Sequence, residues 1–203
     1  ALDYNIISTG GTAELLSKEG IKVTPIYSFT GSEEILDGRV KTLHPKIFGG
    51  ILALRDKEEH LEEIERINTP PIDIVVVNLY PFLEVVKKEN VSEEETLENI
   101  DIGGVSLLRS ASKNYRGVVV LSDPSQYKVF LEELKNRGEI SLETRKKLAS
   151  EAFLCVKRYD EAIFSYFSGE FKERSILPDF LDLSLEKVQN LRYGENPHQK
   201  GFL

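Results

Sequence analysis

The residues best suited to chemistry lie in three short polar stretches that are rich in glycine and proline. These stretches are RVKTLHPKIFGG (residues 39–50), NLYPF (residues 78–82) and DIGGVSLLRSASKNY (residues 101–115). Ordinary loops do not need lysines, a tyrosine and an aspartate beside glycines. That combination suits a site that binds an anionic ligand and transfers protons. The candidate acid–base groups are Lys41, Tyr80, Asp101 and Lys113.

A further glycine-rich turn lies between a strand expected at residues 4–7 and a helix expected at residues 13–19. Small residues at such a place let the backbone N–H groups of a helix start approach a phosphate. The turn can also be merely tight, and it matches neither the dinucleotide nor the ATP fingerprint. Phosphate binding is therefore a hypothesis for these residues, which are Ser8, Thr9, Gly10, Gly11 and Thr12.

Each candidate residue also has a plain structural interpretation. Tyr80 can be half-buried packing, Asp101 can cap the helix that follows it, and Lys113 can favour the negative end of a helix dipole. Lys41 and His44 can be solvated loop residues, and we assign His44 no proton-transfer role. The residue types alone leave these interpretations open.

Composition narrows the class of protein. The chain has 203 residues, of which 40% are hydrophobic and 30% charged, which is typical of a soluble α/β domain with a tail. Its net charge of −8 argues against general nucleic-acid binding, which favours a basic face. Local positive charge at Arg39, Lys41, Arg109 and Lys113 still suits a phosphate.

Other classes of protein find no support in the sequence. The longest apolar runs, such as residues 72–77, are far shorter than the roughly 20 residues of a membrane span. A single cysteine, Cys155, excludes an internal disulfide and fits a reducing cytoplasm. The three histidines, at positions 44, 60 and 198, lack the spacing of metal ligands, so we expect no metal.

The pattern of elements predicts a parallel sheet covered by helices on both faces, since strand-like runs alternate with helical ones. Residues 72–77 form a continuous apolar run, which predicts a strand buried on both faces. Asn78 and Tyr80 follow this strand, at the carboxyl end where open α/β sheets bind ligands. Further strands are expected at residues 21–26 and 117–121, and helices at 60–67, 92–99, 105–111, from 123 to 138, and from 141 to 167.

Residues 169–203 lose this pattern and end on a polar, turn-rich segment, NLRYGENPHQKGFL. We therefore expect one domain over residues 1–168, with residues 169–203 as a linker and the entry to a second domain.

Taken together, STGGT, GRVKTLHPKIFGGIL, NLYPF, ENIDIGGVSLLRSASKNY and LRYGENPHQ resemble the bifunctional purine-biosynthesis family of AICAR transformylase/IMP cyclohydrolase. The likeness runs from Tyr4 to Lys200 with the motifs in the family's order. It implies a methylglyoxal-synthase-like three-layer α/β fold, a cytoplasmic homodimer, and ring closure of the nucleotide FAICAR to IMP without metal or cofactor. The second domain of the family, a formyltransferase, uses 10-formyltetrahydrofolate as cosubstrate.

The resemblance also implies roles for individual residues. It places the family's catalytic groups at Lys41, Tyr80, Asp101 and Lys113. It assigns substrate contacts to Ser8, Thr9, Gly10, Gly11, Thr12, Arg39, Asn78, Gly103, Gly104, Arg192 and Tyr193. The last two match residues that hold AICAR in the transformylase site of the family.

One departure from the family concerns the start of the chain. The family begins with an earlier strand and a phosphate-binding loop, so we expect that strand and loop to be missing before residue 1. Two alternatives share the fold class: a lyase similar to methylglyoxal synthase, and a regulatory module that binds a nucleotide without chemistry. A lyase of this kind favours a site with several carboxylates and histidines. A regulatory module gives Tyr80, Asp101 and the lysines no chemical role.

Overall fold

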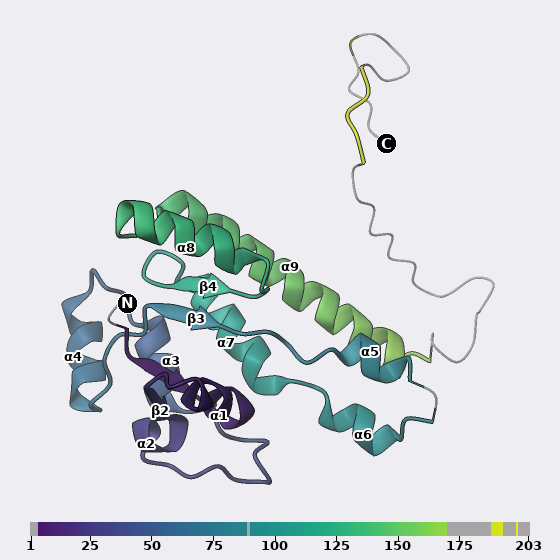
Figure 1. Cartoon of the computed structure of the whole chain (residues 1–203), viewed down its shortest axis with the longest axis horizontal. Helices are drawn as coiled ribbons and strands as arrows, with labels where there is room; N and C mark the ends of the chain where they lie inside the picture. Colours follow the sequence, from purple (N-terminus) through teal and green to yellow (C-terminus); the bar gives the residue numbers. More distant parts are fainter. Residues whose placement is uncertain (1–3, 89, 170–187, 193–197, 199–203) are drawn as a thin grey trace. The chain divides into compact units, whose positions relative to one another are not determined.

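The computed structural model describes residues 4–88, 90–169, 188–192 and 198. The chain divides into two compact units, residues 1–168 and 169–203. The labelled helices and strands belong to the first unit (Figure 1). Within the described residues, no helix combines the length and apolar character that a membrane crossing requires.

Four short strands form two parallel pairs within the described residues. In the first pair, β1 (Ile6–Ser8) lies beside β2 (Val23–Pro25), with Ile6 opposite Val23. In the second pair, β3 (Ile74–Val76) lies beside β4 (Val119–Leu121), with Ile74 opposite Val119. Both pairs confirm the parallel α/β class that the alternating pattern predicts, although β1 and β3 are not paired with each other in the described part.

The helices connect and cover these strands. They are α1 (Gly10–Lys18), α2 (Ile26–Thr30), α3 (Pro45–Leu52), α4 (Glu58–Arg66), α5 (Phe82–Val86), α6 (Glu93–Glu98), α7 (Ile102–Lys113), α8 (Gln126–Arg137) and α9 (Leu142–Phe167). Helices α2, α3 and α5 have no counterpart among the predicted helices. α2 and α5 have five residues each, which is too short to give a periodic pattern. α3 has eight residues and lies in the polar stretch of residues 39–50 and just after it.

Helix ends follow the cap residues in the sequence. The hydroxyl of Ser92 accepts the Glu95 N–H at the start of α6, and that of Ser141 accepts the Thr144 N–H at the start of α9. Gly138 ends α8 with φ of 75°, a left-handed conformation that favours glycine. These side chains and Gly138 satisfy polar groups that a helix end leaves unpaired.

The core lies between β3, β4, α7 and α9. β4 is buried throughout, and Leu108 of α7 is 0% exposed at its centre. The prediction of a strand buried on both faces is wrong for part of β3, because Val76 is 52% exposed. The apolar stripe of α9 is buried at Leu148, Ala152, Val156 and Tyr159, whereas Phe167 is 63% exposed.

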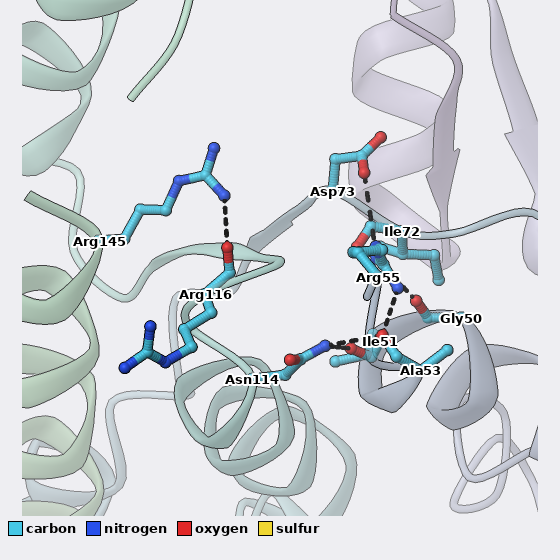
Figure 2. A network of polar contacts seen from close by, with 9 residues as sticks. All are labelled: Gly50, Ile51, Ala53, Arg55, Ile72, Asp73, Asn114, Arg116 and Arg145. Atoms are coloured by element: carbon cyan, nitrogen blue, oxygen red, sulfur yellow. Dashed lines mark hydrogen bonds and ion pairs between the residues drawn. The ribbon is translucent and has the colours of Figure 1, made fainter. Parts of the chain in front are cut away.

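α3 and α7 lie side by side and run in the same direction. At their carboxyl ends, the Asn114 amide donates to the carbonyls of Ile51 and Ala53 at 2.7 and 3.1 Å. The Arg55 guanidinium donates to the same Ala53 carbonyl and to two further carbonyls, those of Gly50 and Ile72 (Figure 2). This network fixes the amino-terminal edge of β3 to α3 and α7. Burial lowers the pKa of Arg55, as expected for a partly desolvated cation.

Candidate functional site

Two of the polar stretches meet where α3 and α7 begin. Thr42, which follows Lys41, lies so close to Gly103 that a Cβ on this glycine would be 2.5 Å from the threonine hydroxyl oxygen. A real side chain cannot approach so closely. Gly103 therefore lets the loop that carries Lys41 lie directly against the amino-terminal end of α7.

The third stretch reaches the same helix end through Leu79. A Cβ on Gly104 would lie 3.0 Å from Cδ2 of Leu79 and would overlap the Asp101 carboxylate. Leu79 precedes Tyr80, so the segment after β3 packs against the first turn of α7. The stretches that contain Lys41, Tyr80 and Asp101 thus converge at the carboxyl end of β3, although 60 positions separate the first from the last of these residues.

Asp101 is the N-cap of α7. Its Oδ1 accepts the Gly104 N–H at 2.6 Å, which satisfies one of the donors that a helix start leaves unpaired. The cap interpretation of this residue is therefore confirmed. The cap leaves other acceptor positions of the carboxylate free of this bond, because an ionised carboxylate has about four such positions and the cap uses one of them. Asp101 remains partly exposed, so solvent or a ligand can reach the group.

Tyr80 and Lys41 have side chains available to a ligand. Tyr80 is 55% exposed, and its phenol makes no hydrogen bond within the described residues. The Lys41 side chain is half-buried and likewise has no hydrogen bond or ion pair in the part of the chain that the structure describes. Phe82 anchors the backbone of Tyr80, since its N–H donates to the Tyr80 carbonyl at 2.8 Å.

Arg39 forms an ion pair with Glu98, the last residue of α6. The hydrogen bond and charge of Glu98 raise the pKa of Arg39, and the same hydrogen bond lowers the pKa of Glu98. Both groups are exposed, so the pair contributes little to stability. It holds the loop that carries Lys41 near the segment that leads into Asp101.

Asn78 lies at the carboxyl end of β3 but points toward α8. Its Nδ2 lies 3.1 Å from the Tyr127 hydroxyl, and that hydroxyl lies 3.3 Å from its Oδ1. Its predicted contact with substrate therefore requires that this exposed hydrogen-bonded pair open or rearrange. Gly103 and Gly104, in contrast, lie at the meeting point of the three stretches and permit their close approach.

Lys113 lies far from this meeting point along α7. It is the last residue of α7, whereas Asp101 precedes the first, and a helix of 12 residues is about 18 Å long. Its neighbour Asn114 belongs to the network of Arg55 at the opposite edge (Figure 2). The exposed Lys113 side chain lies at the carboxyl end of α7, as the dipole interpretation predicts.

The glycine-rich turn joins β1 to α1. Gly10 has φ of 46°, which explains a glycine there, while a Cβ on Gly11 would meet nothing within 4 Å. Thr9 is the N-cap residue of α1, yet its side chain makes no cap hydrogen bond. The first turn of α1 therefore has N–H groups that no capping side chain satisfies, as an anion-binding helix start requires.

The two remaining candidates belong to residues 169–203. Arg192 is among the described residues of that unit, and Tyr193 lies outside the described residues. Two residues of the site surroundings were missed by the sequence interpretation. Thr42 shows no chemical motif, and Tyr159, whose hydroxyl accepts the Asp101 N–H, lies in the apolar stripe of a long helix and shows none either.

Comparison with known proteins identifies the family of this chain. The MGS-like domain family matches residues 1–106, and the AICARFT/IMPCHase bienzyme family matches residues 111–203. The chain therefore belongs to the MGS-like domain family, and the resemblance to the bifunctional purine-biosynthesis enzymes is confirmed.

Individual relatives agree with this assignment. The bifunctional purine biosynthesis protein PurH of Acetivibrio thermocellus is 52% identical over 200 residues, which are 98% of this chain and 39% of that protein. PurH of Thermoanaerobacter sp. (strain X514) is 51% identical over 199 residues, with the same coverage of 98% and 39%. The chain thus spans about two fifths of the length of these relatives.

A solved structure supports the fold. The crystal structure of ForH superposes with a TM-score of 0.70 at 35% sequence identity. The superposition covers 81% of this chain and 85% of ForH.

Proposed function

We propose that this chain catalyses the closure of FAICAR to IMP with loss of water. The observation that carries the proposal is the convergence of three segments on one helix end, through the contact of Thr42 with Gly103 and of Leu79 with Gly104. Those contacts gather a lysine, a tyrosine and an aspartate beside backbone that can approach a ligand closely. The identity to PurH proteins supplies the substrate class.

Ring closure requires stabilisation of a negative charge. The carboxamide nitrogen of FAICAR attacks the formyl carbon, and the formyl oxygen gains the electrons of the broken π bond. The Lys41 ammonium is the group we assign to this oxygen. A fixed donor aimed at such an oxygen contributes roughly 3 kcal/mol to transition-state stabilisation.

Proton transfers complete the reaction. Asp101 accepts a proton from the attacking carboxamide nitrogen, and Tyr80 donates a proton to the formyl oxygen, which becomes a hydroxyl group. This hydroxyl group then leaves as water with the proton of the formamido nitrogen, and the C=N bond of IMP forms between the former formyl carbon and that nitrogen. Transfer of the proton from Asp101 back to Tyr80 through solvent restores both groups. The reacting groups belong to one molecule, so fixing them in contact supplies part of the acceleration.

We place the phosphate of the nucleotide at the turn between β1 and α1. The uncapped helix start supports this placement, because its N–H groups and the positive end of the helix dipole favour an anion. Arg39 is a further nucleotide contact in this proposal. Substrate binding would then compete with Glu98 for the Arg39 guanidinium.

We propose that the active species is a homodimer in which Lys113 of a second copy completes the site. The length of α7 supports this, because Asp101 and Lys113 of one copy lie at opposite helix ends. An exposed apolar face of α9 provides an interface: Phe153, Phe164 and Phe167 are exposed and lie within about 60° around the helix. Sedimentation equilibrium should give twice the chain mass, and a monomeric but active chain would contradict this part of the proposal.

The remaining assignments follow the family. We propose that ring closure needs no cofactor, and that 10-formyltetrahydrofolate serves only the formyltransferase activity of the bifunctional relatives. Arg192 and Tyr193 would hold AICAR for that activity. We expect a cytoplasmic location for the enzyme.

An absorbance assay tests the proposed function. The purified chain should convert FAICAR to IMP, and AICAR, which lacks the formyl carbon, serves as the matched control that cannot close. A parallel titration with IMP measures binding. Tight binding without conversion would favour a regulatory nucleotide module, and release of methylglyoxal from dihydroxyacetone phosphate would favour the lyase; either result would overturn the proposal.

A further inference from the structure

Tyr159 of α9 contacts the segment that carries Asp101. Its side chain is 8% exposed, and its hydroxyl accepts the Asp101 N–H at 2.7 Å. The same hydroxyl donates to the Asn99 carbonyl at 2.9 Å. One phenol therefore holds both ends of the short link between α6 and α7.

The ring of Tyr159 contacts the segment that carries Tyr80. It meets the Phe82 ring edge-on, with centroids 6.1 Å apart and an interplanar angle of 65°. Phe82 is 1% exposed and its N–H donates to the Tyr80 carbonyl. Tyr159 is thus in contact with both segments that supply proposed proton-transfer groups, from a helix that supplies none.

The phenol is suited to a permanent double hydrogen bond. Burial raises the pKa of Tyr159, so the group stays neutral over the whole physiological pH range. A neutral phenol both donates and accepts, whereas a phenolate only accepts. The hydroxyl donates its one proton to the Asn99 carbonyl, so this proton is not available to a substrate.

We propose that Tyr159 is a positioning residue for ring closure: its hydroxyl fixes the backbone at Asn99 and Asp101 and thereby sets where the Asp101 carboxylate lies. This inference rests on the proposed function. The cap bond to Gly104 fixes the carboxylate relative to α7, and the bond to Tyr159 fixes the same residue relative to α9. Two independent anchors leave the carboxylate little freedom.

The substitution Tyr159→Phe tests this, because it removes only the hydroxyl. Tyr166→Phe is the matched control. Tyr166 lies on the same helix and meets Phe82 edge-on with centroids 6.0 Å apart, but its hydroxyl makes no hydrogen bond among the described residues. Thermal unfolding of both variants, and titration with IMP to count binding sites, exclude a loss of folded protein.

Turnover per IMP-binding site should fall about tenfold in Tyr159→Phe with KM within about twofold, and Tyr166→Phe should match the unmodified chain. In an Asp101→Asn background, Tyr159→Phe should have almost no further effect, since Tyr159 acts through Asp101. Amide exchange at Asp101 should quicken only in Tyr159→Phe.

Two results separate the possible failures. If the chain is active but Tyr159→Phe and Tyr166→Phe have the same turnover, the positioning role alone is overturned. The same holds if Tyr159→Phe lowers turnover tenfold in the Asp101→Asn background as well. A chain that binds IMP but never forms it from FAICAR overturns the proposed function and, with it, the role of Tyr159.

Discussion

The two strand pairs of this molecule differ in how completely the helices cover them. β3 and β4 pack against α7 and α9, and every residue of β4 is buried. No residue of β1, β2 or α1 is buried, although these strands are also apolar and parallel. The covered half carries Tyr80 and Asp101, and the other half carries the glycine-rich turn. The groups proposed to transfer protons thus lie on the densely packed half, and the backbone proposed to bind phosphate lies on the less packed one.

The largest expected effect concerns stability. Leu108→Ala, in the covered half, should lower the free energy of unfolding by about 2–5 kcal/mol, because it leaves a cavity in the core. Leu15→Ala in α1, where the side chain is 61% exposed, should change it by less than about 0.5 kcal/mol. Urea unfolding measures both. Equal losses would mean that α1 is packed as tightly as α7, which would remove the difference between the halves.

Asp101→Asn tests the chemistry of the covered half. Turnover should fall about 100-fold with substrate affinity nearly unchanged, because the amide cannot accept the proton. Asparagine is as good an N-cap as aspartate, so α7 should keep its start and the unfolding midpoint should stay close to that of the parent chain. A parallel loss of affinity and turnover in steady-state kinetics would argue against a general base.

Gly11→Ala tests the less packed half. The added methyl group meets nothing within 4 Å in the free chain, so stability should be kept or rise slightly. If the turn holds the phosphate, the methyl group should crowd it and raise KM about tenfold with little change in turnover. An unchanged KM would indicate that the turn is only a tight connection and does not bind the phosphate.

The smallest expected effect is a change in stability at alkaline pH. Because burial raises the pKa of Tyr159 above its ordinary value of 10.0, the native chain keeps this proton when the unfolded chain loses it. The stability that the phenol contributes is therefore complete below pH 10.0 and declines above it. The difference in unfolding free energy between the parent chain and Tyr159→Phe should therefore be smaller at about pH 11 than at about pH 8. A constant difference would show that the phenol has the same pKa folded and unfolded.

Much of the fold could be predicted from the sequence, because local signals specify it. Ser92 and Ser141 cap the helices expected at residues 92–99 and 141–167, and Gly138 ends the helix expected from 123 to 138. Burial could not be predicted in the same way, since it depends on neighbours far along the chain. Val76 shows this: it continues an apolar run but lies exposed on β3.

The candidate site was predictable in its residue types but only partly in its geometry. Its meeting points join Thr42 to Gly103 and Tyr159 to Asp101, pairs that are 58 or more positions apart and leave no periodic trace. The separation of Asp101 from Lys113 did have a signal. The helix predicted over residues 105–111 already lies between them, and the observed α7 of 12 residues places them about 18 Å apart.

The central claim is that the segments around Lys41, Tyr80 and Asp101 form one nucleotide site. Amide chemical shifts recorded during titration with IMP test it most directly. We expect shifts at residues 39–42, 78–80 and 101–104 that follow a single dissociation constant. Saturable binding that shifts only one of these segments would contradict the claim.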